Sequence, residues 1–427
     1  MAEKKKFLGW YFDTPLVWRI LIALVLGAII GLIVGPDIAV VEPFGTLMLK
    51  LLQMVVLPLI FFAIVVGVGG TPASKIGKIA VKILVYYTVT TVFAAACGIA
   101  LAHIFKPGLG ANLAGAAAAV EGAKLETPSV SSILLNMVPD NVVGAFVEGS
   151  YLQVLLFASF FGLAISFLRD SKDDRVRNAV MAVYTFCEGG SEIMFTITQA
   201  VLEYTPVGVF ALISVVFAQE GIRVIGSLGK LITACYIGYL FQIFVVYVLL
   251  LSIFKLDFRK FFANAKDVMF MAFATRSSNS VLPLSLTTSE EKLGVSRTVG
   301  GFTLPLGSQV NMDGEAYYQI LSVFFVANAT GVSLSPAEQL LMVLVVTLGS
   351  IGTAGIAGSG PVVLLAVMNM VGLKVEPGSA VAAAFALVLG IDVILDMGRT
   401  TANVTGDLVG TCIVAKSEGL IDLEKWK

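Results

Sequence analysis

Polar and charged side chains interrupt an apolar segment at residues 391–407, at steps of three or four residues. They are Asp392, Asp396, Arg399, Thr400, Asn403 and Asp407. Side chains at this spacing share one face of an α-helix. The guanidinium of Arg399 is a planar fork that grips a carboxylate in two places, and the carboxylate of Asp396, one turn earlier, suits an ammonium group. This face therefore predicts a clamp for an amino acid with an acidic side chain.

The composition assigns this clamp to a membrane protein. Of the 427 residues, 57% are hydrophobic and 13% are charged, whereas soluble domains are about a quarter charged. Apolar stretches of about 18 residues or more predict membrane-spanning helices, and the clearest lie at residues 16–34, 47–68, 79–105, 151–167 and 231–254. Because an ionisable residue at the centre of a bilayer costs about 2.5–3.5 kcal/mol, the charged face must turn toward protein, ions or substrate.

Two similar units make up the second half of the chain. In residues 260–328 an apolar arm ends at a polar tip, TRSSNS at 275–280, and the return arm leads to a helix broken at 307–314. In residues 336–416 the tip is SIGTAGIAGSG at 350–360, and a long helix follows. Half-arms of roughly 10–14 residues are too short to cross a bilayer and predict re-entrant hairpins. The alternative is two kinked spans that tolerate Ser and Gly.

The hairpin tips carry groups that bind ions. Helix N-termini have free N–H groups, so the amides at Ser277, Ser278 and residues 355–360 are expected to cradle a carboxylate. Hard cations prefer oxygen ligands. Carbonyl oxygens for sodium are expected at unwound points at Gly307, Gln309, Ser350 and Thr353.

Buried acids predict that cations bind here. Asp313 and Glu315 join the three acids of the last segment. Arg276 and Arg399 oppose them, and the remaining excess of negative charge would be compensated by bound cations. For Asp392, an internal network with arginine that holds helices together explains the sequence equally well.

Lysine and arginine in the loops predict the orientation. They concentrate at residues 4–19, 75–82, 169–177 and 255–266, and loops rich in positive charge stay in the cytoplasm. We therefore expect both termini in the cytoplasm and, because no short apolar core with a cleavage site follows the basic first residues, no cleaved signal peptide. The net charge of −1 excludes a general nucleic-acid binder, and the four cysteines have no metal or redox spacing.

At these motifs the chain resembles the glutamate/aspartate transporter family (dicarboxylate/amino acid:cation symporters), and within it the archaeal sodium-coupled aspartate transporters. The resemblance rests on TRSS, on NMDG at 311–314 and on LGIDVILDMGRTTANVTGD at 389–407. It implies an all-α multi-span protein of the prokaryotic plasma membrane with eight transmembrane helices, two re-entrant hairpins and inverted repeats, assembled as a homotrimer.

The resemblance also implies an elevator mechanism. A scaffold of residues 1–75 (spans one and two) and 130–222 (spans four and five) would surround the transport domain. That domain would comprise residues 76–108 (span three) and 223–427 (span six, the two hairpins and spans seven and eight), with an external loop at 109–129.

Residue roles follow from the same resemblance. Arg399 would hold the substrate side chain and Asp396 the α-amino group. The α-carboxylate would be held by Asn403, Thr400, Ser277, Ser278 and the second tip with Gly355, Ile356 and Gly360. Of three sodium ions, one would bind Gly307, Asn311, Asn403 and Asp407. A second would bind carbonyls of Gln309, Ser350, Ile351 and Thr353, with Met312 close by. A third would bind Tyr87, Thr90, Thr91, Asn311 and Asp313. No organic cofactor is implied.

Glu315 departs from the family pattern, in which threonine usually follows NMDG. Its carboxylate could neutralise Arg399, which would leave a site for a neutral or larger amino acid. Protonated by burial, it could instead donate a hydrogen bond to an acidic substrate or carry a coupled proton. A third alternative is that it turns away from the substrate.

The sequence thus predicts a sodium-coupled secondary active symporter of aspartate or glutamate. Rivals are a neutral amino acid and a C4-dicarboxylate coupled to protons, although a dicarboxylate without an amine gives Asp396 no partner. An intramembrane aspartyl hydrolase is disfavoured because Asp392 and Asp396 lie adjacent on one helix, whereas catalytic carboxylates must converge on one water. A channel would not need an amino-acid clamp.

Overall fold

The computed structural model describes residues 14–70, 77–111, 113, 135, 138–350 and 357–426. Across these ranges the chain is almost entirely helical, and the isolated β-bridge that they contain pairs Val295 with Ile421. The expected all-α architecture is confirmed at this level. Most of the expected external loop at 109–129 lies outside the described residues, as do Ile351, Thr353, Gly355 and Ile356 of the second tip.

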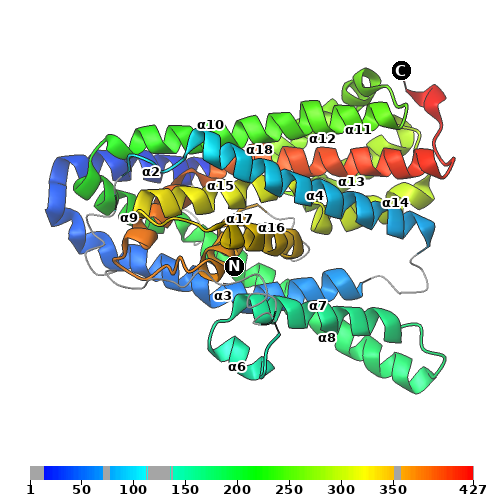
Figure 1. Ribbon diagram of the computed structural model, residues 1–427, viewed down its shortest axis with the longest axis horizontal. Helices are drawn as coiled ribbons and strands as arrows, with labels where there is room; N and C mark the ends of the chain where they lie inside the picture. The colour runs from blue at the N-terminus through cyan, green and yellow to red at the C-terminus, as the bar shows by residue number, and fades with distance from the viewer. Residues whose placement is uncertain are drawn as a thin grey trace, which may run out of the picture.

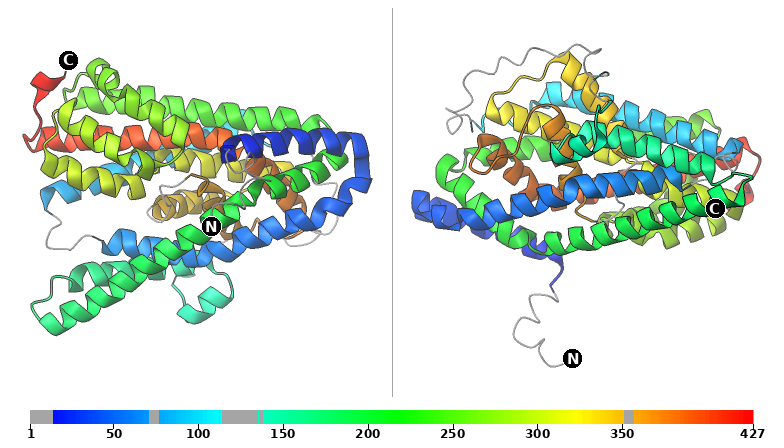
Figure 2. Two further views of the ribbon diagram at one scale, coloured as in Figure 1. Left: turned by 180° about the vertical axis from the view of Figure 1, so that it is seen from behind. Right: turned by 90° about the horizontal axis from the view of Figure 1, so that it is seen from below.

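One group of helices packs around α3 and α9. It comprises α2 (Leu16–Val34), α3 (Glu42–Gly69), α7 (Tyr151–Leu168), α8 (Asp174–Glu203) and α9 (Thr205–Glu220), with the short α6 (Val142–Val147) before α7. The chain reverses direction between α2 and α3 through the 3₁₀ turn Gly35–Val41 (Figure 2). Glycine lets α2 approach α9 closely, because a Cβ at Gly31 would lie 2.2 Å from the carbonyl oxygen of Ser214.

A second group surrounds the long last helix, α18 (Ala380–Ser417), which is buried along most of its length. It comprises α4 (Lys78–Phe105), α10 (Arg223–Phe241), α12 (Phe258–Thr275), α14 (Arg297–Val310) and α15 (Asp313–Thr330). Figure 1 shows α18 extended among these helices, with the C-terminus at one end of the molecule. A π-helical turn, Gln242–Val246, joins α10 to α11 (Tyr247–Ile253). The charged face of α18 therefore lies inside this group.

The first hairpin turns at the expected tip. The helix α12 ends at Arg276, which has a φ of 55°, and α13 (Ser278–Glu291) begins after the N-cap Ser277. With 18 residues, α12 is longer than the arm expected from the apolar pattern, because Asp257 caps it well before that apolar run. In the second hairpin α16 (Pro336–Ser350) and α17 (Gly360–Met370) flank the tip.

The break before α15 is shorter than the sequence predicted. Only Asn311 and Met312 separate α14 from α15. Gly307 and Gln309 lie in the last turn of α14, where the Gly307 carbonyl accepts a hydrogen bond from the Asn311 amide at 2.8 Å. The expectation that these two carbonyls sit in unwound chain is wrong, as it is for Ser350, the last residue of α16. The physical reason is that the helices continue to these residues, and only the last carbonyls of a helix lack an intrahelical donor.

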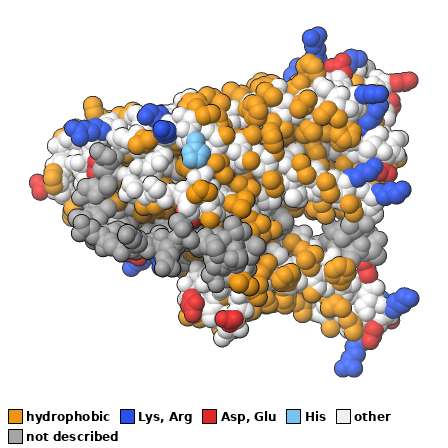
Figure 3. All heavy atoms as spheres, in the orientation of Figure 1, with side chains coloured by type: hydrophobic (Ala, Val, Ile, Leu, Met, Phe, Trp, Pro, Cys, Tyr) orange, Lys and Arg blue, Asp and Glu red, His pale blue; other side chains and the backbone are white. Residues whose placement is uncertain are grey.

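Several helices are long and apolar enough to cross a membrane. Among the described residues they are Trp18–Gly69, which covers most of α2 and all of α3, Lys78–Phe105, Arg223–Ile253 and Ala380–Ser417. The pair α8 and α9, bent by 49°, adds a fifth if it is one span. Figure 3 shows apolar side chains over the middle of the visible face and Lys and Arg toward its ends. A multi-span protein is thereby supported, and the number of eight spans stays a prediction.

The residues after α18 fold back onto the base of the first hairpin. The indole N–H of Trp426 donates to the Leu293 carbonyl at 2.7 Å, and the Trp426 carbonyl accepts from Lys260 at 3.1 Å. The Asp422 amide donates to the Gly294 carbonyl at 2.8 Å. With Trp426 4% exposed, these contacts fasten the C-terminal segment to α12 and to the turn after α13.

We predict that Gly294→Ala releases this C-terminal segment. Gly294 has a φ of 65°, and a Cβ there would lie 2.0 Å from the Asp422 carbonyl oxygen. Gly419→Ala is the matched control, because Gly419 has a φ of 69° but open space where its Cβ would stand. Limited proteolysis after α18 should be at least about tenfold faster in Gly294→Ala than in the control. Equal rates would contradict a role for this contact.

Candidate substrate and ion site

The guanidinium of Arg399 lies at the centre of the charged face of α18. Its Nη2 is 2.8 Å from Oδ1 of Asp396, and its Nη1 is 3.5 Å from Oδ1 of Asp392. The ring of Tyr318 covers one side, with 4.4 Å between its centroid and Cζ of the arginine. Arg399 is 2% exposed. The two opposite charges that the spacing placed on one face therefore lie together, and they pair with each other; their role as a clamp stays a prediction.

Glu315, in the first turn of α15, pairs with the same guanidinium. Its Oε2 is 3.1 Å from Nε of Arg399, and its Oε1 accepts a hydrogen bond from the Gln319 amide at 2.9 Å. The side chain is buried. This geometry matches the alternative in which a second carboxylate compensates Arg399, and not the one in which Glu315 turns away.

Both hairpin tips meet the pair formed by Asp396 and Arg399. From the first tip, Nη1 of Arg276 is 3.6 Å from Oδ2 of Asp396. From the second, the Gly358 amide donates to the same oxygen at 3.1 Å. Gly360 lies so close that a Cβ there would be 1.8 Å from Nη1 of Arg399. The first residue of α17 therefore packs directly against the guanidinium of Arg399.

The remaining expected substrate ligands differ in their contacts. Thr400 donates to Oδ1 of Asp396 at 3.0 Å. The side chain of Asn403 joins the start of α15, because its Oδ1 accepts from the Gly314 amide at 2.7 Å and its Nδ2 lies 3.2 Å from the Met312 sulfur. Ser277 caps α13, and Ser278 follows it as a buried first residue.

Asp313 is held by three neutral donors. Thr91 donates to its Oδ1 at 2.8 Å, and Gln242 and Tyr247 each donate to its Oδ2 at 2.8 Å. Within the described part of the chain it has no ion pair. Tyr87 and Thr90 of the expected third sodium site make other bonds, Tyr87 to the Thr303 carbonyl and Thr90 to carbonyls of its own helix. Such i−4 bonds satisfy a buried hydroxyl without a ligand.

Asp407 and Asn311 form a second group of oxygen atoms. The Asn311 amide nitrogen donates to Oδ1 of Asp407 and to the Asn403 carbonyl, both at 3.0 Å. Gly307 faces the same carboxylate. The buried Oδ1 of Asn311 has no hydrogen-bond partner among the described residues. The four residues expected to bind the first sodium ion thus converge, and an unpaired oxygen in their midst fits a hard cation.

Three contributors were missed by the sequence reasoning. Gln242 and Tyr247 hold Asp313, and Gln319 holds Glu315. Gln242 is the one amide side chain in the apolar run 231–254, which was a usable signal because a buried amide needs partners. Of the residues expected to bind the second sodium ion, Ile351 and Thr353 lie outside the described residues. The side-chain amide of Gln309, another of them, donates a hydrogen bond to Asn279 at 2.8 Å.

Comparison with known proteins decides the family. Residues 16–417 match the sodium:dicarboxylate symporter family. The chain belongs to this family. The predicted membership is confirmed, and so is the prediction that the protein is a transporter and not an enzyme. The likeness to archaeal sodium-coupled aspartate transporters stays a prediction.

The symporter can be matched over almost its full length to several bacterial proteins. It is 33% identical over 420 residues to the proton/sodium-glutamate symport protein of Bacillus subtilis, and the matched region covers 96% of this chain and 94% of the relative. It is 32% identical over 427 residues to the proton/glutamate-aspartate symporter of Escherichia coli, with coverages of 96% and 94%. It is 34% identical over 423 residues to C4-dicarboxylate transport protein 3 of Bradyrhizobium diazoefficiens, with coverages of 97% and 91%.

We predict that Gly307→Ala weakens sodium binding. A Cβ there would lie 2.5 Å from both Oδ1 of Asp407 and the Tyr87 hydroxyl, so the proposed ligands must shift. Gly301→Ala in the same helix is the control, because its Cβ would meet no atom within 4 Å. In a sodium titration followed by thermal stability, the half-saturating concentration should rise at least about tenfold in Gly307→Ala alone. Identical titrations for the two variants would argue against an ion at this position.

Proposed function

We propose that this symporter takes up a small amino acid together with sodium ions as a secondary active transporter. One observation carries the proposal: a clamp with a charge of each sign lies beside two buried acids, Asp313 and Asp407, that have no positive partner within the described residues. A zwitterion requires a group of each sign, which Asp396 and Arg399 supply. The unpaired acids supply the charge that cations require.

Acidic amino acids are the substrate class that the relatives favour. The names of the Bacillus subtilis and Escherichia coli proteins state glutamate, and the latter also aspartate. In this assignment Arg399 receives the side-chain carboxylate and Asp396 the α-amino group. Asn403, Thr400, the start of α13 and the tip at Gly360 surround the α-carboxylate.

A C4-dicarboxylate, coupled to protons, is the second candidate. The Bradyrhizobium protein is named for such substrates. The observation that favours it is the position of Arg276, 3.6 Å from Asp396. A substrate without an amine offers Asp396 no positive charge, and Arg276 could then supply that charge.

Three sodium ions are proposed to accompany the substrate. The first is supported by the convergence of Gly307, Asn311, Asp407 and the Asn403 carbonyl. Another is supported by the buried carboxylate of Asp313, which accepts a hydrogen bond from Thr91. Asn311, also expected at this ion, lies two positions before Asp313 in the chain break. The one assigned to Gln309, Met312, Ser350, Ile351 and Thr353 rests on the family resemblance.

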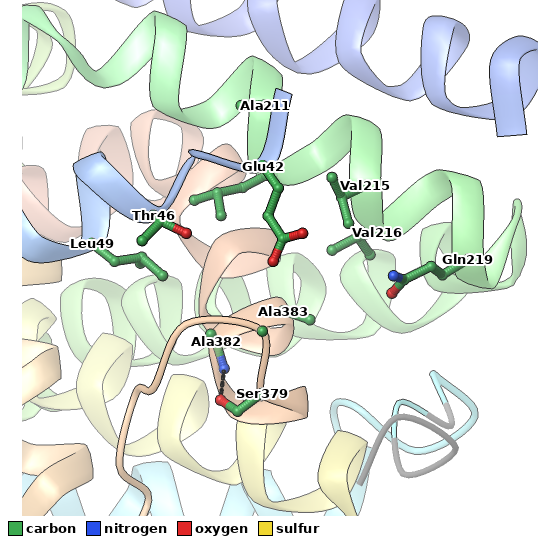
Figure 4. Close-up of a pocket in the computed structure, with 12 residues that line it drawn as sticks. Glu42, Thr46, Leu49, Ala211, Val215, Val216, Gln219, Ser379, Ala382 and Ala383 are labelled. Carbon is green, nitrogen blue, oxygen red and sulfur yellow. Dashed lines mark hydrogen bonds between the residues drawn. The ribbon is translucent and has the colours of Figure 1, made fainter. Parts of the chain in front are cut away.

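An elevator motion is proposed between the group around α3 and the group around α18. All described contacts of Arg399, Asp313 and Asp407 come from α18 and the helices packed around it or from the second tip. Figure 4 shows a cavity between the groups, lined by Glu42 and Thr46 of α3, Val215 and Gln219 of α9, and Ser379 before α18. A boundary that is incompletely filled can slide at lower cost than a close-packed one.

Both termini are proposed to be cytoplasmic, in a homotrimer of the plasma membrane. Basic residues from three parts of the chain meet at the end of the molecule that carries the C-terminus: Lys82 pairs with Glu418, Lys260 binds the Trp426 carbonyl and Lys425 binds the Glu290 carbonyl. Basic ends of membrane helices favour the cytoplasm. The trimer rests on family membership.

Uptake into proteoliposomes tests the proposal. With an inward sodium gradient, at least one radiolabelled amino acid from a complete panel should accumulate above equilibrium, and choline in place of sodium should abolish accumulation. Accumulation driven by a proton gradient without sodium would contradict sodium coupling. Uptake of succinate in preference to every amino acid would support the second candidate.

We predict that Asp396→Asn lowers amino-acid affinity at least about 100-fold in saturating sodium, because the α-amino group loses its counter-charge. The change keeps the shape of the side chain. Asp267→Asn is the control, since Asp267 forms an exposed pair with Lys292 at 2.8 Å, outside the site. Calorimetric titration measures both. Unchanged affinity in Asp396→Asn would contradict the proposal that Asp396 binds the α-amino group.

A further inference from the structure

The side-chain end of the proposed site contains more acids than arginines. Glu315, Asp392 and Asp396 each have an oxygen within 3.5 Å of a guanidinium nitrogen of Arg399. Arg276, beside Asp396, is the second positive charge. Three carboxyl groups therefore face two guanidinium groups before any substrate arrives. A substrate with an acidic side chain would add a further carboxylate in a buried space where water does not screen the repulsion.

The face of α15 beside Arg399 is rich in hydrogen-bond acceptors. Glu315, Gln319 and Ser322 follow one another at i, i+4 and i+7 and are all buried. The Gln319 amide nitrogen donates to Glu315, which fixes the orientation of the amide. Its Oε1 then points elsewhere, and this oxygen has no hydrogen-bond partner among the described residues. A buried acceptor without a donor is costly, and a ligand N–H would satisfy this oxygen.

Arg399 keeps one weakly engaged donor. Its Nε and Nη2 lie within 3.2 Å of carboxylate oxygens, whereas among the described residues the carboxylate contact of Nη1 is the 3.5 Å one with Asp392. Nη1 faces Gly360 at the start of α17. Nη1 is therefore the guanidinium nitrogen that would gain most from a further acceptor, such as a substrate oxygen.

We propose that Glu315 makes the symporter selective for amino acids with a carboxamide side chain, asparagine or glutamine, over aspartate and glutamate. The carboxamide oxygen accepts from Nη1 of Arg399. The carboxamide NH₂ group donates to the Glu315 carboxylate and to Oε1 of Gln319. The group brings no net charge, whereas a carboxylate has no hydrogen to donate to these acceptors.

This selectivity rests on the proposed function, because the α-amino and α-carboxylate groups are held as described for an amino acid. It concerns the side-chain end alone. The symporter would then prefer a different substrate from the relatives named for glutamate. The cause would be Glu315, at the position where the family resemblance expects threonine.

Titration calorimetry in saturating sodium, with asparagine, glutamine, aspartate and glutamate, tests the proposal on the purified full chain. The wild type should bind the better amide at least about tenfold more tightly than the matching acid. Glu315→Gln, which keeps the shape and removes the charge, should lower this ratio at least about tenfold, and Glu315→Thr should reverse it.

Glu203→Gln is the matched control. It makes the same chemical change at an acid paired with a buried arginine, Arg19, at 2.7 Å, in α8 and outside the site. The ratio should stay at the wild-type value in this variant. Size-exclusion chromatography establishes that each variant is folded.

The experiment distinguishes failure of the selectivity proposal from failure of the proposed function. If the wild type binds the acids as tightly as the amides or more tightly, the selectivity proposal is overturned while sodium-coupled amino-acid binding stands. A ratio that neither Glu315 variant changes also overturns it. If no amino acid binds to the wild type or to Glu315→Thr in sodium, the proposed function itself fails.

Discussion

The burial of Arg399 in α18 is the constraint on which the rest of the structure depends. Its guanidinium is always charged, and at membrane depth it is tolerated only when partners compensate it. Carboxylates from α15 and α18 and the ring of Tyr318 collect around it. The hairpin tips complete the enclosure with Arg276 and the amide of Gly358. Non-helical backbone survives in a membrane where it lines such a polar centre, so the buried charge is compatible with the re-entrant turns that the sequence predicts.

The break between α14 and α15 connects the clamp to the proposed ion sites. Asn311, within the break, binds the Asp407 carboxylate and the Asn403 carbonyl. Asn403 in turn accepts from the Gly314 amide through its side chain. An ion that draws on the oxygens of Asp407 and Asn311 would therefore shift the backbone that positions α15 and with it Glu315. This is a physical route by which the binding of ions and the binding of substrate can affect one another's free energy.

Much of the fold could be predicted because local signals were strong. The bounds of α2 agree with the apolar run between Pro15 and Gly35, and the spacing of acids on α18 predicted their shared buried face. Contacts between distant segments could not be predicted in the same way. Gln242 reaches Asp313 across 71 positions of sequence, and a π-helical turn sets its direction. The three alternatives for Glu315 were left open because side-chain direction depends on the packing of Gln319 and Arg399 beside it.

The first turn of α15 separates two electrostatic environments within one helical turn. Asp313 and Glu315 are two residues apart, so their side chains point about 200° apart around the helix axis. Asp313 faces Thr91, Gln242 and Tyr247, which carry no charge, whereas Glu315 faces Arg399. The same short segment can therefore offer an uncompensated acid to a cation on one side and a compensated acid to a substrate on the other. A change at Glu315 should alter substrate selectivity while the oxygens around Asp313 keep their positions, because the rigid helix between them separates the two sets of contacts.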